Sequence, residues 1–147
     1  MGFLSSLNIS ASALTAAQTR LDVISENLTN QNTTRTENGG PYRRKMVVYS
    51  EIPANQTFRS ILDGEMTARM SKGGVQVSQI LEDQTEFNPV YDPSNPDANE
   101  DGYVLMPNVD PAKETLDFME TTRFYESNLQ AMNAMKYMIS KSLELGR

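Results

Sequence analysis

The sequence predicts an α+β protein in which long N- and C-terminal helices form an antiparallel, coiled-coil-like pair and a small β-rich region lies between them along the chain. Leucines at heptad spacing predict the first helix, and an apolar stripe behind capping residues predicts the last. Two β-branched runs bounded by glycine or charge predict the centre. We expect the three regions to cover residues 1–34, 35–108 and 109–147 of a chain whose length fits one domain.

The first helix is expected from about Leu7 to Leu28. Its apolar residues recur at the three-four spacing of a helical seam: Leu7, Leu14, Ala17, Leu21, Ile24 and Leu28. A helix of this length spans roughly 33 Å. It should end where Asn27, Asn30 and Asn32 and the nearby threonines compete for backbone hydrogen bonds. Small Ser and Thr side chains dominate the opposite face, which favours close approach of a neighbouring helix.

The last helix is expected to begin at Asp110-Pro111, because Asp is a good N-cap and Pro fits the first helical position. Glu114 in the first turn complements the helix dipole, and Gly146 follows the last helical residue. One narrow stripe carries large apolar side chains: Tyr125, Leu129, Met132, Ile139 and Leu143. The other side carries Ala131, Ala134 and Met138.

A helix that is apolar on two sides needs more cover than a chain of this size provides, so we expect one side to contact another subunit. The predicted seam within the subunit joins Leu14, Leu21, Ile24 and Leu28 to Leu129, Met132, Ile139 and Leu143. The predicted contact with the next subunit consists of Ala131, Ala134 and Met138. The entropy cost of closing the long loop between the helices offsets much of the free energy gained by burying the apolar seam. We therefore expect the termini to fold together on assembly.

The central region is expected to contain strands at Met46–Tyr49 and Gly74–Leu81. Residues 88–107 are rich in Pro, Asp and Asn, which predicts a loop or an irregular hairpin with Tyr103–Leu105 as one arm.

Composition argues against several functions. The net charge of −6 disfavours nucleic acid as a partner, and no apolar run is long enough to span a membrane. The chain has neither His nor Cys, so the commonest general base and the thiolate nucleophile are both missing. We therefore expect no enzyme, no cofactor and no catalytic, cofactor-binding or metal-binding residues.

Two alternatives remain open. Residues 97–102 match the first half of a calcium loop, with Asp97, Asn99 and Asp101 as oxygen ligands and Gly102 at the sixth position. The twelfth position, where that loop needs a bidentate Glu, holds Asn108, so an Asp/Asn turn is favoured over a calcium-tuned adaptor. A carboxylate-based hydrolase is the third hypothesis, and it would need a defined pocket.

The basic run Arg43-Arg44-Lys45 has two interpretations. It either forms a solvated strand end or meets an acidic region of another subunit, such as Glu82-Asp83 or Glu100-Asp101.

Residues 21–36 and 39–45 together carry a specific pattern. They read Leu-Asp-Val-Ile-Ser-Glu-Asn-Leu-Thr-Asn-Gln-Asn-Thr-Thr-Arg-Thr and Gly-Gly-Pro-Tyr-Arg-Arg-Lys, and the chain resembles the flagellar basal-body rod family, in particular its proximal-rod members, in these residues. The resemblance extends through residues 90–93, 96–97, 100–104 and 106–109 to the ending at residues 143–147, and so covers nearly the whole chain.

The resemblance implies a structural subunit that is exported by the flagellar type III apparatus without a cleaved signal. The start of the chain agrees, because it lacks the features of a secretory signal. The implied partners are copies of itself, other rod proteins and the export apparatus. The implied role is helical assembly into the rod, outside the cytoplasmic membrane in the periplasm or cell-wall zone, where the rod transmits motor torque to the hook. The terminal helices would form an inner axial domain and the centre would lie outside it.

Overall fold

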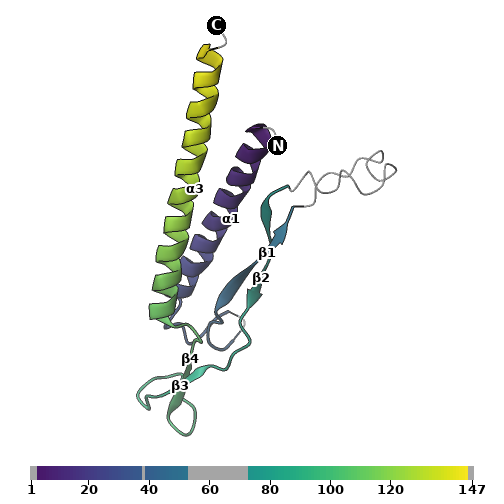
Figure 1. Cartoon of the computed structure of the whole chain (residues 1–147). Coiled ribbons are helices and arrows are strands. Elements are labelled where there is room, and N and C mark those ends of the chain that lie inside the picture. The colour runs from purple at the N-terminus through teal and green to yellow at the C-terminus, as the bar shows by residue number, and fades with distance from the viewer. Residues whose placement is uncertain (1–2, 38, 53–72, 146–147) are drawn as a thin grey trace, which may run out of the picture. The chain divides into compact units, whose positions relative to one another are not determined.

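The computed structural model describes residues 3–37, 39–52 and 73–145. Along these residues the elements are helix α1 and strands β1 to β4, followed by helix α3 (Figure 1). Their bounds are α1 Phe3–Thr29, β1 Lys45–Glu51, β2 Val75–Glu82, β3 Asn88–Tyr91, β4 Tyr103–Met106 and α3 Pro111–Leu145. The α+β prediction and both terminal helices are confirmed, and so are the strands expected at β1, β2 and β4.

The fold divides into two compact units, each built from separate stretches of the chain. The first contains α1 up to Thr19, β1 from Val48, β2 up to Gln79 and α3 from Thr122. The second contains residues 20–47 and 80–121.

In the first unit, strands β1 and β2 pair antiparallel. Ile52 N donates a hydrogen bond of 3.0 Å to Gly74 O, and Ser78 Oγ donates one of 3.1 Å to Val48 O. Ser12 of α1 accepts a hydrogen bond from Val75 N at its hydroxyl, which attaches the helix to the start of β2. Gly74 has a φ of 111°, and a Cβ there would overlap the Ser12 hydroxyl. The close approach of helix and strand therefore requires glycine at this position.

In the second unit, β3 and β4 form an antiparallel hairpin in which Asn88 lies opposite Met106 and Tyr91 opposite Tyr103. Sequence reasoning identified only the β4 arm, because Pro89 interrupts the other arm. Proline is tolerated here since a two-stranded ribbon offers free edges. Val104 is buried and contributes to the core with Tyr42 and Val109.

Both helix ends in this unit follow the capping expectations. Asp110 Oδ1 accepts hydrogen bonds from Ala112 N at 2.9 Å and Lys113 N at 3.4 Å, as an N-cap should. At the end of α1, the Asn30 side chain donates a 3.0 Å hydrogen bond to Glu26 O, competing for a carbonyl of the helix. Among the described residues, no helix has both the length and the apolar character that a membrane crossing needs.

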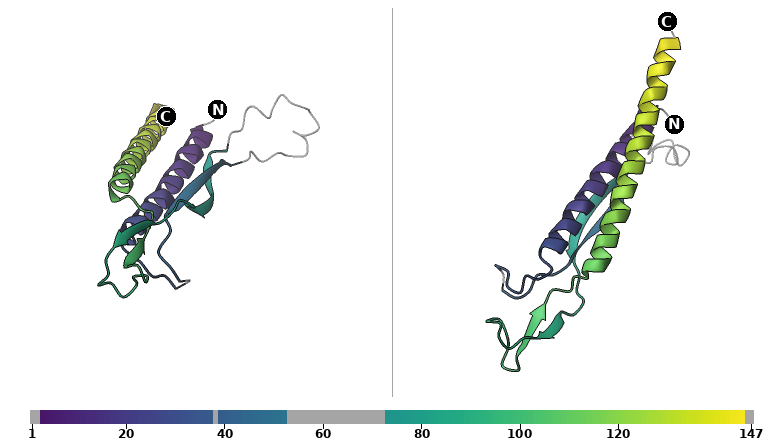
Figure 2. Two further views of the ribbon diagram at one scale, coloured as in Figure 1. Left: turned by 90° about the horizontal axis from the view of Figure 1, so that it is seen from below. Right: turned by 90° about the vertical axis from the view of Figure 1, so that its left-hand side faces the viewer.

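The end of α1 lies against the start of α3. Arg20 forms an ion pair with Asp117 at 3.4 Å, and the later α1 residue Asn27 bonds to the earlier α3 residue Glu114 at 3.1 Å, so the two helices run antiparallel here. Both views in Figure 2 show this stretch, with the end of α1 in blue and the start of α3 in green.

Candidate functional site

Asn27 is 1% exposed and lies near the end of α1 on the buried side of the helix. Its Nδ2 donates to Lys45 O at 2.9 Å and to Glu114 Oε2 at 3.1 Å. Its Oδ1 accepts from Tyr42 OH and from Lys45 N, both at 2.9 Å. All four hydrogen-bonding positions of the amide are therefore filled, which removes the cost of burying it.

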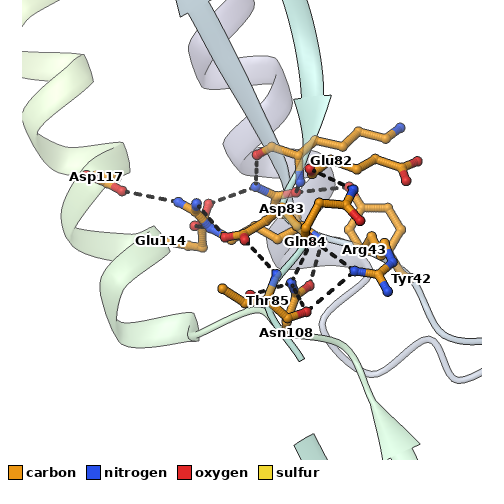
Figure 3. A network of polar contacts seen from close by, with 12 residues as sticks. Tyr42, Arg43, Glu82, Asp83, Gln84, Thr85, Asn108, Glu114 and Asp117 are labelled. Atoms are coloured by element: carbon orange, nitrogen blue, oxygen red, sulfur yellow. Dashed lines mark hydrogen bonds and ion pairs between the residues drawn. The ribbon is translucent and has the colours of Figure 1, made fainter. Parts of the chain in front are cut away.

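Glu114 of α3 is fully covered by protein. One carboxylate oxygen accepts from Asn27, and the other accepts from Arg44 Nε at 2.6 Å. The Arg44 guanidinium also lies 3.6 Å from Asp83 and 3.8 Å from Asp117. Figure 3 shows this network, with Asp83, Glu114 and Asp117 labelled and the contacts drawn as dashed lines. Burying a carboxylate without a partner is costly, and the charged, directional bond from Arg44 offsets this cost. Because no surface of Glu114 is open, substrate cannot reach the carboxylate.

Asn108, in the segment before α3, extends the same arrangement to the loop after β2. Its Oδ1 accepts from Arg44 N at 2.9 Å, and its Nδ2 donates to Thr85 Oγ1 at 2.8 Å. Arg43 reaches that loop from the other side, where its guanidinium donates to Asp83 O and stacks 4.4 Å from the centre of the Phe87 ring.

We call Asn27, Tyr42, Arg44, Asp83, Asn108, Glu114 and Asp117 the polar cluster. It joins the end of α1, the start of β1, the loop after β2 and the first turns of α3, all within the second unit. Among the described residues, no buried side-chain nitrogen or oxygen lacks a hydrogen-bond partner. A fully satisfied network of this kind fixes one arrangement of its segments, because any shift leaves a buried polar group unpaired.

The cluster shifts two protonation equilibria. Burial raises the pKa of Tyr42 well above its ordinary value, and the nearby Glu26, Glu114 and Glu82 raise it further. The pKa of Asp83 is lowered, mainly because its carboxylate accepts a 3.0 Å hydrogen bond from Thr85 N, with a further contribution from Arg44.

Replacing Tyr42 by phenylalanine is expected to lower the free energy of unfolding by about 1 kcal/mol at pH 7, because Asn27 Oδ1 loses a donor. The native chain holds Tyr42 neutral, so this contribution is complete below the unfolded pKa of about 10 and is lost as pH rises above it. The difference between the two proteins should therefore shrink between pH 9 and pH 11 in urea unfolding followed by circular dichroism. A difference that stays constant over this range would contradict the assignment.

The basic run before β1 finds its partners in its own chain. Arg44 contacts Asp83, Glu114 and Asp117, and Lys45 forms an ion pair with Glu26. Of the two acidic regions that the sequence offered as complements in another subunit, Glu82-Asp83 supplies Asp83 to Arg44, but within the same chain. The interpretation of Arg43–Lys45 as a solvated strand end is wrong, because the chain uses all three side chains internally.

The interpretation of residues 97–102 as an Asp/Asn turn is confirmed. Asn99 Oδ1 accepts from Asp101 N at 3.1 Å and from Tyr103 N at 2.8 Å, and Asp97 Oδ2 accepts from Thr34 Oγ1 at 2.8 Å. Gly102 has a φ of 80°, which suits the turn into β4. Of the side-chain oxygens that a calcium loop would supply, that of Asn99 thus stabilises the local backbone, and that of Asp97 binds the Thr34 hydroxyl.

The structure places the predicted seam residues at different depths. On α1, Ile24 is buried and Leu14, Leu21 and Leu28 are half-buried. On α3, Met132 and Ile139 are half-buried, whereas Leu129 and Leu143 are exposed. Of the predicted helix-ending residues, Asn27 joins the polar cluster, Asn30 is half-buried at the helix end and Asn32 is exposed.

The residues predicted to face another subunit, Ala131, Ala134 and Met138, are all exposed on α3. They belong to a longer series of exposed apolar side chains on this helix. The most solvent-exposed of these side chains in the single chain are Leu116, Met119, Phe124, Tyr137, Met138, Leu143 and Leu145. Met138 is 51% exposed and Leu143 is 70% exposed, values that are high for such side chains.

Sequence reasoning missed the polar cluster, although one signal was present. Asn27 follows Ile24 by three positions and precedes Leu28 by one, so it lies on the apolar side of the helix. A polar side chain there must find buried partners. From the sequence alone, Glu114 is explained by the helix dipole, because a carboxylate in the first turn suits that role as well as it suits a bond to Asn27.

The comparisons with known proteins agree along the whole chain. Residues 7–35 match the family described as flagella basal body rod protein, and residues 100–145 match the C-terminal family of the flagellar basal body rod FlgEFG proteins. The chain is 54% identical to the flagellar basal-body rod protein FlgC of Bacillus subtilis, over 97% of both chains. It is 37% identical to FlgC of Salmonella typhimurium over the full length of both, and 34% identical to FlgC of Borreliella burgdorferi over 99% of this chain and 98% of the relative.

Proposed function

The chain belongs to the flagellar basal-body rod family, with FlgC proteins among its relatives, and we propose that it is exported by the flagellar type III apparatus and assembles helically to transmit motor torque to the hook. It is a structural protein of the basal-body rod and not an enzyme. Its partners are other rod proteins, to which the proposal adds copies of itself and the export apparatus.

The observation that supports the assembly step is the exposed apolar series on α3. Burying such side chains stabilises an interface by about 25 cal/mol per Å² of apolar surface. Each chain that joins a helical array can cover this face with a neighbour, and the small Ala131 and Ala134 permit the close backbone approach that dense packing needs.

In the proposed array, residues 1–34 and 109–147 form an inner axial layer with coiled-coil-like seams, and residues 35–108 lie outside it. Leu14, Leu21, Ile24 and Leu28 would pack against Leu129, Met132, Ile139 and Leu143 in this layer. The helical neighbours complete the cover that α3 lacks in a single chain. Many modest contacts of this kind share the applied load, so none has to be strong alone.

The polar cluster suits a protein that transmits force. It links α1, β1 and α3 through short, directional bonds in a water-excluded site, where each bond is stronger than at the surface. A force on one helix is thereby passed to the other segments without rearrangement of the unit.

Hydrogen exchange before and after assembly tests the proposal. The sequence predicts that both terminal helices fold on assembly over their whole length. The polar cluster joins residues 20–29 to residues 111–121 within a single chain, so the prediction now applies to residues 7–19 and 122–145. Amides at residues 20–29 and 111–121 should be protected from exchange in a verified monomer. Amides at residues 7–19 and 122–145 should become at least about tenfold more protected in isolated basal bodies. Equal protection of residues 7–19 and 122–145 in the monomer and in basal bodies would refute folding on assembly. Absence of the chain from isolated basal bodies would refute the location.

A further inference from the structure

One face of the β3–β4 hairpin is apolar and uncovered. Side chains of directly paired residues share a face, and pairs along the ladder alternate between faces, so Pro89, Tyr91, Tyr103 and Leu105 lie together. All four are exposed, Tyr91 to 65% and Leu105 to 48%. The two tyrosine rings meet edge to face, with their centres 5.3 Å apart. We call these four residues the hairpin face.

The surroundings of the hairpin face are acidic. Residues 73–112 contain no Lys or Arg, and they carry eight carboxylates: Glu82, Asp83, Glu86, Asp92, Asp97, Glu100, Asp101 and Asp110. One of these, Asp83, is paired with Arg44 in the polar cluster. Four of these lie in the loop that joins the two strands, residues 92–102. Arg35 lines the same hollow as Asp97 and Tyr103, and it offsets one of these charges. The tip of the hairpin therefore keeps a negative field around an apolar centre.

The hairpin is held rigid by its own contacts. Asn99 Oδ1 accepts from two backbone N–H groups of the turn, and Asp92 Oδ1 accepts from Ser94 N and Ser94 Oγ. A Cβ at Gly102 would lie 3.0 Å from the Tyr91 ring, so glycine lets this ring pack directly on the turn. A surface that is ordered before binding loses little conformational entropy when a partner docks.

We propose that the hairpin face is a docking surface for a protein partner that presents an apolar spot surrounded by Lys and Arg side chains. This proposal rests on the proposed function of the chain as a rod subunit, and it specifies the surface chemistry of one protein that contacts the chain there. Charge complementarity selects this partner, because like charges face to face are strongly unfavourable. The same field disfavours the hairpin face of a second copy, and it disfavours anionic glycans or lipids.

Photocrosslinking in assembled flagella tests the proposal. The photoreactive residue benzoylphenylalanine replaces Tyr91 in a strain whose only copy of the gene carries this change, basal bodies are isolated after irradiation, and crosslinked peptides are mapped by mass spectrometry. The expected adduct joins the benzoylphenylalanine at position 91 to another protein, at an apolar residue with Lys or Arg nearby. An immunoblot of the same basal bodies reports rod membership separately from the contact.

Charge variants decide the role of the acidic tip. Glu100 and Asp101 are exposed, and their side chains make no hydrogen bond or ion pair with the described residues. The double variant Glu100→Lys with Asp101→Lys is expected to lower the yield of the adduct roughly tenfold. The milder Glu100→Gln with Asp101→Asn should lower it less. The matched control is Glu37→Lys with Glu51→Lys, which changes the net charge equally at exposed positions outside the hairpin and should leave the yield unchanged.

Four results would overturn the proposal while leaving rod membership intact. They are an adduct only with glycan, an adduct only with the hairpin of another copy, an adduct whose yield both charge variants leave unchanged, and no adduct in basal bodies that contain the chain. Absence of the wild-type chain from isolated basal bodies would instead refute the proposed function.

Discussion

Replacing Asn27 by leucine is expected to lower the free energy of unfolding by about 3–5 kcal/mol, because several buried polar groups lose their hydrogen-bond partner at once. Leucine has a similar size, so the change removes the amide without opening a large cavity. It leaves Tyr42 OH, Lys45 N, Lys45 O and one oxygen of Glu114 without their partner in a site that water does not reach. An unsatisfied buried group costs about 1–3 kcal/mol, and the apolar gain of leucine offsets part of the total.

Urea unfolding followed by far-ultraviolet circular dichroism measures this effect. Asn32→Leu is the matched control, because it makes the same chemical change at an exposed position, and it should alter stability by less than about 0.5 kcal/mol. Asn27→Asp keeps the shape but cannot donate to Lys45 O and brings a carboxylate beside Glu114, so it should be at least as destabilising as leucine at pH 7. Equal effects of the changes at positions 27 and 32 would show that the cluster does not stabilise the fold.

Replacing Ala134 by aspartate is expected to abolish rod assembly and swimming while the isolated chain remains folded. Ala134 is exposed in the single chain, so the cost to folding should be limited to the lower helix propensity of Asp, about 0.7 kcal/mol. In the proposed array the same carboxylate would be buried without a partner at every subunit contact, at several kcal/mol each. A small local change thus becomes a large effect through repetition along the rod.

Swim-ring diameter in soft agar and electron microscopy of isolated basal bodies measure this outcome. Ser140→Asp provides the control, since it adds the same charge to an exposed position of α3 that lies between the two apolar sides. The control strain should swim like the wild type. If Ala134→Asp also supports normal swimming, this side of α3 is not a subunit contact. If the purified variant is unfolded, the loss of motility carries no information about the contact, and Ala131→Asp and Met138→Asp then decide the matter.

The helices were predictable because their signals are local. The Asp110-Pro111 start and the heptad leucines each act within a few residues, and the structure confirms both helices to within a few positions. Strand β3 was not identified as a strand, because its four residues include a proline and owe their conformation to pairing with β4.

The polar cluster was not predictable for a related reason. Asn27 and Glu114 are 87 residues apart in sequence, and Arg44 and Glu114 are 70 apart. No local preference connects such residues, and only the fold brings them together. The sequence does show that Asn27 interrupts an apolar stripe, but it does not show which of the many carboxylates and backbone groups would satisfy the amide.

The hydrogen bonds between Asn27 and Lys45 also have a consequence for strand β1. Alternate residues of a strand direct their N–H and C=O groups to opposite edges, and Arg44 O accepts from Asp83 N on the β2 side, so the groups of Lys45 point to the outer edge. The Asn27 amide occupies that edge as one peptide unit of an additional strand would. An open edge invites pairing with any extended chain, and such pairing leads to aggregation. One asparagine side chain thus occupies the outer edge of β1 at Lys45, where an additional strand would otherwise find a free N–H and C=O group.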